Sequence, residues 1–181
     1  MIAIMSDLSL TLAPLLGDDL FVPAEAVLFH KDDPVEHLYV VRSGAVHLVR
    51  YGESGSVAVM QRATAGSVLA ESSIFGSNYH CDGLVVADAT LGRASMAAVR
   101  AAMRDDPALL DALARHLARE VQRTRSRVEL LSCKTVEDRL DGWLALNGGA
   151  LPQRGAWRSV AEDIGVSPEA FYRELQRRRK A

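Results

Sequence analysis

The stretch that decides the fold is LYVVRSGAVHLV, residues 38–49. Two short apolar runs flank the pair Ser43-Gly44, and their β-branched and aromatic residues favour strands with a turn between them. Similar runs, separated by turn residues, occur at 26–29, 57–60 and 84–87. Many short strands at regular spacing predict an antiparallel sandwich or barrel over about residues 20–94.

Composition excludes several classes of protein. The chain has 181 residues, of which 49% are hydrophobic and 24% charged, which is typical of a globular protein and not of a disordered or collagen-like one. The net charge of −2 indicates that any nucleic-acid site must be a local basic patch. Two cysteines are too few for a disulfide scaffold or a four-cysteine metal site, and they favour reduced thiols in a cytoplasm. We expect neither a signal peptide nor a membrane span.

The period changes after the β region. Residues 7–18 predict a short N-terminal helix, and from Ser95 onward the spacing is helical again. Asp106-Pro107 is a strong start signal for a long helix. Its apolar stripe consists of Leu110, Leu113, Leu117, Val121, Thr124, Val128 and Leu131. The stripe could cover the β domain or form a coiled-coil seam between two subunits, and its length favours the dimer because a small β domain cannot cover it alone.

The C-terminal region predicts a helix pair with a glycine turn. A helix over about 136–146 ends at Asn147-Gly148-Gly149. The helix pair follows in 157–175. There Gly165 makes the turn, Ser167 caps the last helix and Pro168 begins it, which is the pattern of a helix-turn-helix. Residues 154–181 contain seven basic and four acidic side chains, so this tail is basic inside an acidic protein.

Taken in this order, the parts resemble the Crp/Fnr family of bacterial transcription regulators over nearly the whole chain. The resemblance is carried by residues 27–34, 38–44, 66–71, 106–107 and 165–169. It implies an α+β fold with an antiparallel, jelly-roll-like β-roll sensor domain and N-terminal helix in 1–105. A dimerisation helix in 106–134 and a helix-turn-helix domain in 135–181 complete it. Relatives continue into a β-hairpin wing, and this chain stops at Ala181, so the expected domain lacks a wing.

The function that the resemblance implies is a cytoplasmic, homodimeric, DNA-binding transcription regulator. The expected partners are DNA, a second copy bound through helix 107–133, RNA polymerase, and a small-molecule or redox effector. We expect no enzyme, because the sequence shows no nucleophile–base arrangement, phosphate loop or metal-ligand spacing. Two alternatives remain: the C-terminal domain docks a protein, or the chain is a thiol, haem or metal sensor that does not bind DNA directly.

The effector segment departs from the family. In its cyclic-nucleotide binders a glutamate holds the ribose and the arginine of an Arg-Ser-Ala triplet pairs with the cyclic phosphate. Here Gly66 and Glu71 are present, but the triplet is Cys81-Asp82-Gly83, so a phosphate would meet a carboxylate. We therefore expect an effector other than cyclic AMP or cyclic GMP. The candidate pocket residues are Glu71, Tyr79, His80, Cys81, Asp82 and Thr124.

The segment Tyr79-His80-Cys81-Asp82 has two competing interpretations. It could be a thiol redox sensor, a haem or soft-metal site with His80 and Cys81 as ligands, or a pocket for another ligand. Alternatively, Cys81 is a small buried apolar residue and His80 a satisfied polar group. No cofactor is required by the sequence, and no set of metal ligands stands out. A protonated His80 beside the thiol would lower the pKa of Cys81, whereas Asp82 would raise it.

The last helix is the candidate DNA reader. By the resemblance, Glu169 and Arg173 match a base-contacting glutamate and a later arginine, while Pro168 replaces the first arginine and removes a donor. We expect the basic run 177–180 to supply phosphate contacts. The candidate DNA-binding residues are Ser167, Glu169, Tyr172, Arg173, Arg177 and Arg178.

Overall fold

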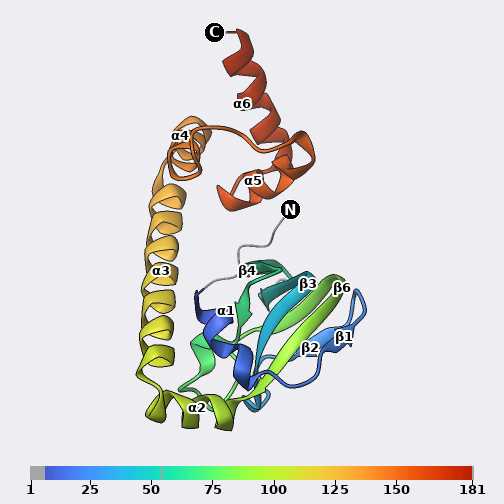
Figure 1. Cartoon of the computed structure of the whole chain (residues 1–181). Helices are drawn as coiled ribbons and strands as arrows, with labels where there is room; N and C mark the ends of the chain where they lie inside the picture. Colours follow the sequence, from blue (N-terminus) through green and yellow to red (C-terminus); the bar gives the residue numbers. More distant parts are fainter. Residues whose placement is uncertain (1–6, 54, 181) are drawn as a thin grey trace. The chain divides into compact units, whose positions relative to one another are not determined.

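The computed structural model describes residues 7–53 and 55–180, with the side chain of Lys180 left out (Figure 1). The chain forms two compact units, residues 1–117 and residues 118–181. The division falls inside a single long helix, α3 (Pro107–Ser132), so that each unit contains part of it. Each unit is described below by itself. No helix of the described residues combines the length and the apolarity that crossing a bilayer requires.

The first unit is built around an antiparallel sheet (Figure 1). Its strands are β1 (Leu20–Val22), β2 (Val27–Phe29), β3 (His37–Tyr51), β4 (Val57–Thr64), β5 (Val68–Leu69) and β6 (Asp82–Ser95). The order is β1-β6-β3-β4, with β2 also paired to β6 and β5 to β3. All of these pairings are antiparallel, which confirms the predicted α+β class and the antiparallel sheet.

The central strands are longer than the sequence predicts. Instead of two strands with a turn at Ser43-Gly44, β3 runs through this pair without a break, and its pairing with β6 shifts register on either side of Ser43. Gly44 has φ +81°, and a Cβ at this position would lie 2.1 Å from the carbonyl oxygen of Asp88. The glycine therefore serves a bulge at a close backbone approach, so the predicted turn is wrong.

The N-terminal helix is shorter than predicted. Helix α1 (Asp7–Leu12) passes into the 3-10 turn η1 (Ala13–Leu15) instead of continuing to residue 18. Pro14 explains the change, because it lacks the N–H that an α-helix needs at that position. Leu8 and Leu12 are each 1% exposed and anchor α1 on the sheet.

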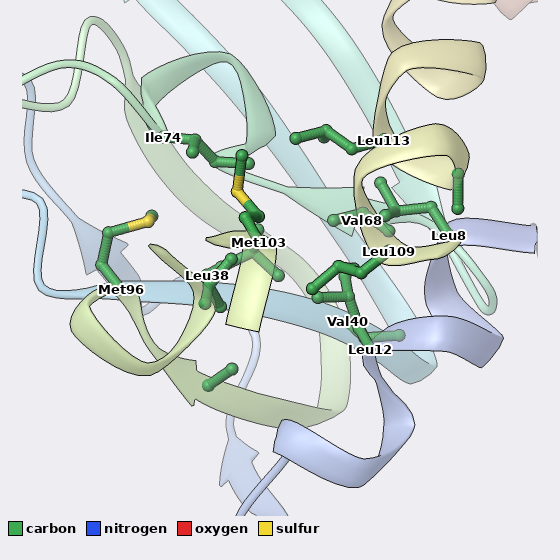
Figure 2. Packing of buried hydrophobic residues seen from close by; sticks show 13 residues of the cluster. Leu8, Leu12, Leu38, Val40, Val68, Ile74, Met96, Met103, Leu109 and Leu113 are labelled. Atoms are coloured by element: carbon green, nitrogen blue, oxygen red, sulfur yellow. The ribbon is translucent and has the colours of Figure 1, made fainter. Parts of the chain in front are cut away.

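A hydrophobic core joins the sheet to the helices of this unit. Figure 2 shows Leu8 and Leu12 of α1, Leu38 and Val40 of β3, and Leu109 and Leu113 of α3 in one cluster. Met96 and Met103 reach it from α2 (Met96–Asp105). The first turns of α3 are therefore part of the β unit, and Asp106 fixes their start by accepting from the Ala108 N–H at 2.9 Å.

The long apolar stripe of α3 divides into two parts. Leu113 is buried in the core of the first unit and Leu117 packs against it. Val121, Val128 and Leu131 are instead 48%, 58% and 40% exposed. Leu113 and Leu117 in the N-terminal part of the stripe thus pack on the β unit, while its C-terminal part leaves an apolar face uncovered. The seam between two subunits stays a prediction.

The second unit contains the rest of α3 and a small helical domain. Its elements are α4 (Val136–Leu146), η3 (Arg154–Ala156), α5 (Trp157–Asp163) and α6 (Pro168–Lys180). Thr135 caps α4 by accepting from the Asp138 N–H at 3.0 Å. The buried core consists of Leu140, Val160, Ala161, Ile164 and Phe171. The predicted helix bounds, the glycine turn and the capped last helix are all observed.

Candidate functional site

The segment expected to hold an effector begins at the turn after β4. Gly66, at φ +90°, donates its N–H to the Val41 carbonyl at 2.8 Å. The chain then forms β5 and the 3-10 turn η2 (Glu71–Ser73). Glu71 is only 8% exposed. The structure thus places this carboxylate inside the β-roll and not on its surface.

Tyr79 is a buried packing residue of the β-roll. It is 4% exposed and stacks on Phe29, with ring centroids 4.0 Å apart. Its hydroxyl donates to the His37 carbonyl at 2.8 Å and accepts from the His37 N–H at 3.1 Å. Burial is the main cause that raises the pKa of this phenol. These contacts hold β2, β3 and the segment before β6 together, so Tyr79 is a packing residue.

His80 and Cys81 do not form the pair that thiol activation requires. The Nδ1 of His80 lies 3.2 Å from the hydroxyl oxygen of Ser73, and burial followed by the charge of Arg50 lowers the pKa of the imidazole. Cys81 is 2% exposed, and burial raises the pKa of its thiol despite the opposing effect of Arg50. A neutral imidazole and a protonated, buried thiol favour the packing interpretation over the sensor one.

The described residues contain no group of three or more His, Cys, Asp or Glu side chains that could hold a metal ion. His80 and Cys81 are consecutive residues in the bend just before β6, and His80 is partly exposed whereas Cys81 is buried. A buried thiol beside a partly exposed imidazole does not favour a shared metal or haem iron.

Asp82 and Arg50 supply the charges beside this segment. Asp82 Oδ1 lies 3.2 Å from His30 Nδ1 and accepts from the Lys31 N–H at 3.2 Å. Arg50 donates its Nε–H to the His80 carbonyl at 2.8 Å. Sequence reasoning missed Arg50. Arg42, another arginine of β3, pairs with Asp19 at 2.7 Å. The strand register would have identified Arg50, because its neighbour Val49 pairs with Asp82.

A small cavity of about 270 Å³ lies beside the stacked rings of Phe29, Tyr39 and Tyr79. The carboxylates of Asp33 and Glu36 also line it. Acidic walls disfavour a phosphate group. Thr124, the remaining effector candidate, belongs to the second unit and lies on the exposed side of α3.

The helix-turn-helix geometry depends on one glycine. Gly165 adopts φ +65°, and a Cβ there would lie 2.6 Å from Leu131 Cδ2. The residue is thus required both by the backbone conformation and by the close approach to α3. Ser167 then caps α6 by accepting from the Ala170 N–H at 3.2 Å, as the sequence predicts.

Helix α6 has one buried and one exposed side. Phe171 is fully buried, while Glu169, Tyr172, Arg173 and Gln176 are exposed and recur three or four residues apart. They therefore share one face of the helix. Gln176 was missed in the sequence, although the same spacing would have indicated it. Ser167 is also exposed, just before the first turn.

Arg177 and Arg178 take part in ion pairs within the unit. Arg177 lies 2.6 Å from Glu137 and 2.9 Å from Glu174, and Arg178 lies 2.6 Å from Asp141 and 2.7 Å from Glu174. Hydrogen bonding from Arg177 is the main cause that lowers the pKa of Glu174. These pairs fasten α6 to α4, which the sequence did not predict for either arginine.

Arg139 joins three elements of the second unit, and sequence reasoning missed it. Its guanidinium donates to the carbonyls of Leu131 at 3.1 Å and Cys133 at 2.9 Å, at the end of α3. It also donates to the carbonyls of Ile164 and Gly165, both at 3.2 Å, at the turn after α5. Four carbonyls at helix ends are thus satisfied by one side chain. The turn of the helix-turn-helix is thereby fixed to α3.

The comparisons agree with this architecture. Residues 20–106 match the sequence model of the cyclic nucleotide-binding domain family. A search of curated proteins finds no match to the chain. FixK2 from Bradyrhizobium japonicum is similar in structure, with a TM-score of 0.73 and 20% identity over 90% of this chain and 84% of that one.

Two further solved structures show the same likeness. The c-di-GMP-responsive global regulator CLP of Xanthomonas campestris has a TM-score of 0.66 and 19% identity over 90% of this chain and 86% of its own. The catabolite activator protein of Thermus thermophilus has a TM-score of 0.57 and 21% identity over 97% and 84%. Residues 20–106 therefore match the cyclic nucleotide-binding domain family, and the chain has the fold of the solved structures of FixK2, CLP and the catabolite activator protein.

Proposed function

We propose that this chain is a homodimeric, DNA-binding transcription regulator whose β-roll responds to something other than a cyclic nucleotide. The observation that carries the proposal is the polar face of α6, formed by exposed Glu169, Tyr172, Arg173 and Gln176. A helix whose other side is buried and whose N-terminus is capped presents such a face at a fixed angle. This is the arrangement that a helix needs to read base edges in a major groove.

The roles on this face follow from hydrogen-bonding chemistry. Glu169 can accept from a cytosine amine, and Arg173 can donate two hydrogen bonds to a guanine or one to a phosphate. Gln176 can reach an adenine or a phosphate in the same way. Since Arg177 and Arg178 are held by Glu137, Glu174 and Asp141, the phosphate contacts expected from 177–180 fall first to exposed Arg179.

Dimerisation is supported by the exposed part of the apolar stripe. Val121, Val128 and Leu131 lie uncovered on α3, with Thr124 between them. A second copy of α3 would bury this face in a parallel seam. We expect Val121→Glu/Val128→Glu to sediment as a monomer, because it places carboxylates in the apolar seam. The β unit should stay folded, because neither residue packs in its core. A wild-type chain that is monomeric at micromolar concentration would contradict the dimer.

The effector proposal rests on the segment that replaces the phosphate-binding triplet. Tyr79 and Cys81 are buried, and Asp82 places a carboxylate where a cyclic phosphate would need a cation. We expect calorimetry to show no binding of cyclic AMP or cyclic GMP tighter than about 10 μM. Tighter binding would contradict this proposal, and it should then depend on Arg50, the guanidinium that contacts this segment.

A gel shift against salt tests the DNA-binding function. The full chain is titrated with the DNA upstream of its own gene, beside Arg173→Ala and the control Arg104→Ala, an exposed arginine of α2 in the β unit. Arg173→Ala should weaken binding by about 1–3 kcal/mol, and Arg104→Ala should leave it unchanged. No shift by wild-type protein at low salt, or equal losses in both variants, would favour the alternative in which this domain docks a protein.

A further inference from the structure

The helical unit contains a cavity that the proposed function does not use. It has a volume of about 670 Å³ and lies between α3, the C-terminal part of α4 and the end of α5. All of its lining residues fall between 119 and 163, so it belongs wholly to the second unit. Cavities of about 300–1,000 Å³ are the size that small organic ligands occupy.

Its walls combine positive charge with apolar surface. Arg119, Arg123 and Arg127 line it from α3 at intervals of four residues, so their guanidinium groups follow one another along one side of the helix. The apolar part is formed by Leu130, Trp143 and Leu146. An aromatic ring and two leucines beside a row of guanidinium groups suit a ligand that is apolar at one end and anionic at the other.

Acidic residues reduce the positive charge without cancelling it. Asp163 is the one acidic residue among those that line the cavity, and Glu120 pairs with Arg123 at 2.5 Å. A guanidinium has five N–H donors in a planar fork, so one that already meets a carboxylate keeps donors for a second anion. Arg119 and Arg127 also interact within the protein, and because each guanidinium keeps donors beyond its partner, the row still suits a ligand with one negative charge.

The cavity is held open by close packing at its edge. A Cβ on Gly142 would lie 2.4 Å from Leu130 Cδ2, so Leu130 packs directly against α4 and a larger residue at 142 would displace its side chain. Arg139 ties the end of α3 to the turn after α5 through the four carbonyls described above. Because these contacts fix the three walls, little ordering of the protein opposes binding.

The cavity also stays accessible in the proposed dimer. At about 3.6 residues per turn, Arg119 and Arg123 lie on the other side of α3 from Val121 and Val128. A partner helix on the apolar stripe would therefore leave Arg119 and Arg123 uncovered, whereas Arg127 lies nearer to the stripe. One dimer would carry two such cavities.

We propose that this cavity binds a small organic anion in which an aromatic or other apolar group carries a carboxylate, sulfonate or phosphate. The apolar group contacts Trp143 and Leu146, and the anion meets the guanidinium groups of Arg119 and Arg123. The inference concerns ligand binding alone and does not depend on DNA binding by α6.

Calorimetry on the full chain with three probes tests both halves of this chemistry. 2-Naphthoate carries the ring and the charge, 2-naphthol the ring without the charge, and inorganic phosphate the charge without the ring. We expect 2-naphthoate to bind with a dissociation constant below about 1 mM and the other two to bind at least about tenfold more weakly. Equal binding of 2-naphthol, or no binding of 2-naphthoate at 1 mM, would overturn the proposal.

Charge-matched variants and one tryptophan locate the binding. Arg119→Gln/Arg123→Gln should weaken 2-naphthoate about tenfold, whereas Arg115→Gln/Arg125→Gln removes the same charge from exposed positions of α3 outside the cavity and should not. In Trp157→Phe, Trp143 is the one remaining tryptophan, and its indole N–H resonance should shift on titration. Equal losses in the two pairs, or calorimetric binding without a Trp143 shift, would place the ligand elsewhere and overturn the proposal.

Discussion

The β unit and the helical unit use their chemically distinctive residues in opposite ways. In the β unit Tyr79 and Cys81, which the sequence marks as a sensor motif, are 4% and 2% exposed and pack inside the roll. In the helical unit Glu169, Tyr172 and Arg173 stand exposed on one face of α6. The place of a motif in the chain therefore indicates a function, while burial decides whether its side chains can reach a ligand.

The two cysteines give the strongest test of this contrast. Cys81 in the β unit is buried with a raised thiol pKa, whereas Cys133 in the helical unit is half-buried. We expect iodoacetamide to modify Cys81 at least about a hundredfold more slowly than Cys133 in the folded chain, because the reaction at Cys81 requires the roll to open. Mass spectrometry of timed samples measures both rates. A folded-state Cys81 that reacts with a midpoint below about pH 8 would restore the thiol-sensor interpretation.

A core deletion in one unit should leave the other intact. Phe171 is 0% exposed, so Phe171→Ala should destabilise the helical unit by about 3–5 kcal/mol. Both tryptophans lie in this unit, so their fluorescence during urea unfolding reports on it alone. The neighbouring Tyr172→Ala, 39% exposed, should cost less than about 1 kcal/mol. Equal losses in the two variants would contradict the assigned sides of α6.

The sequence predicts the helices better than the strands, for a physical reason. Start and stop signals such as Asp106-Pro107, Asn147-Gly148-Gly149 and Gly165 act locally, and the helices begin and end where they stand. Ser43-Gly44 resembles a turn locally, but Gly44 responds to the backbone of Asp88 on another strand. Such a contact is set by tertiary pairing, which local spacing does not contain.

The same distinction explains what was predicted of the candidate site. The resemblance implied Glu169 and Arg173 of the exposed face, with Tyr172 as a further candidate, and Gln176 extends this face by one further interval. Arg50 and Arg139 were missed because their hydrogen bonds go to backbone carbonyls on other elements. Arg177 and Arg178 were predicted to face phosphates because their acidic partners Glu137 and Asp141 are distant in sequence.

Arg139 should be the residue whose loss most disturbs the junction between α3 and the helix-turn-helix. Arg139→Gln loses donors to four carbonyls, and we expect the helical unit to lose about 2 kcal/mol of unfolding free energy. Arg158→Gln, which breaks one exposed ion pair to Glu162, is the matched control and should change little. Urea unfolding followed by tryptophan fluorescence compares them. An Arg139→Gln chain as stable as the control would contradict the role given to this guanidinium.

The smallest expected effect is a pH dependence confined to the β unit. Burial lowers the pKa of His80 from its ordinary value of 6.5, so the folded state favours the neutral imidazole. The unfolded chain then binds the proton more readily, and stability falls as the pH drops below 6.5. In His80→Gln the loss between pH 7 and 5 should be smaller, as measured by urea unfolding with circular dichroism. Identical pH profiles for the two chains would contradict a half-buried, neutral His80 in the folded β unit.

Selection from a random DNA pool tests the central claim most directly, that the exposed face of α6 gives this chain a nucleic-acid function. The full-length chain is incubated with the pool at low salt, and the bound sequences are recovered and read. We expect an inverted repeat with half-sites about one helical turn apart, and loss of one base preference per half-site in Arg173→Ala. A wild-type pool without any enriched inverted repeat would contradict this claim.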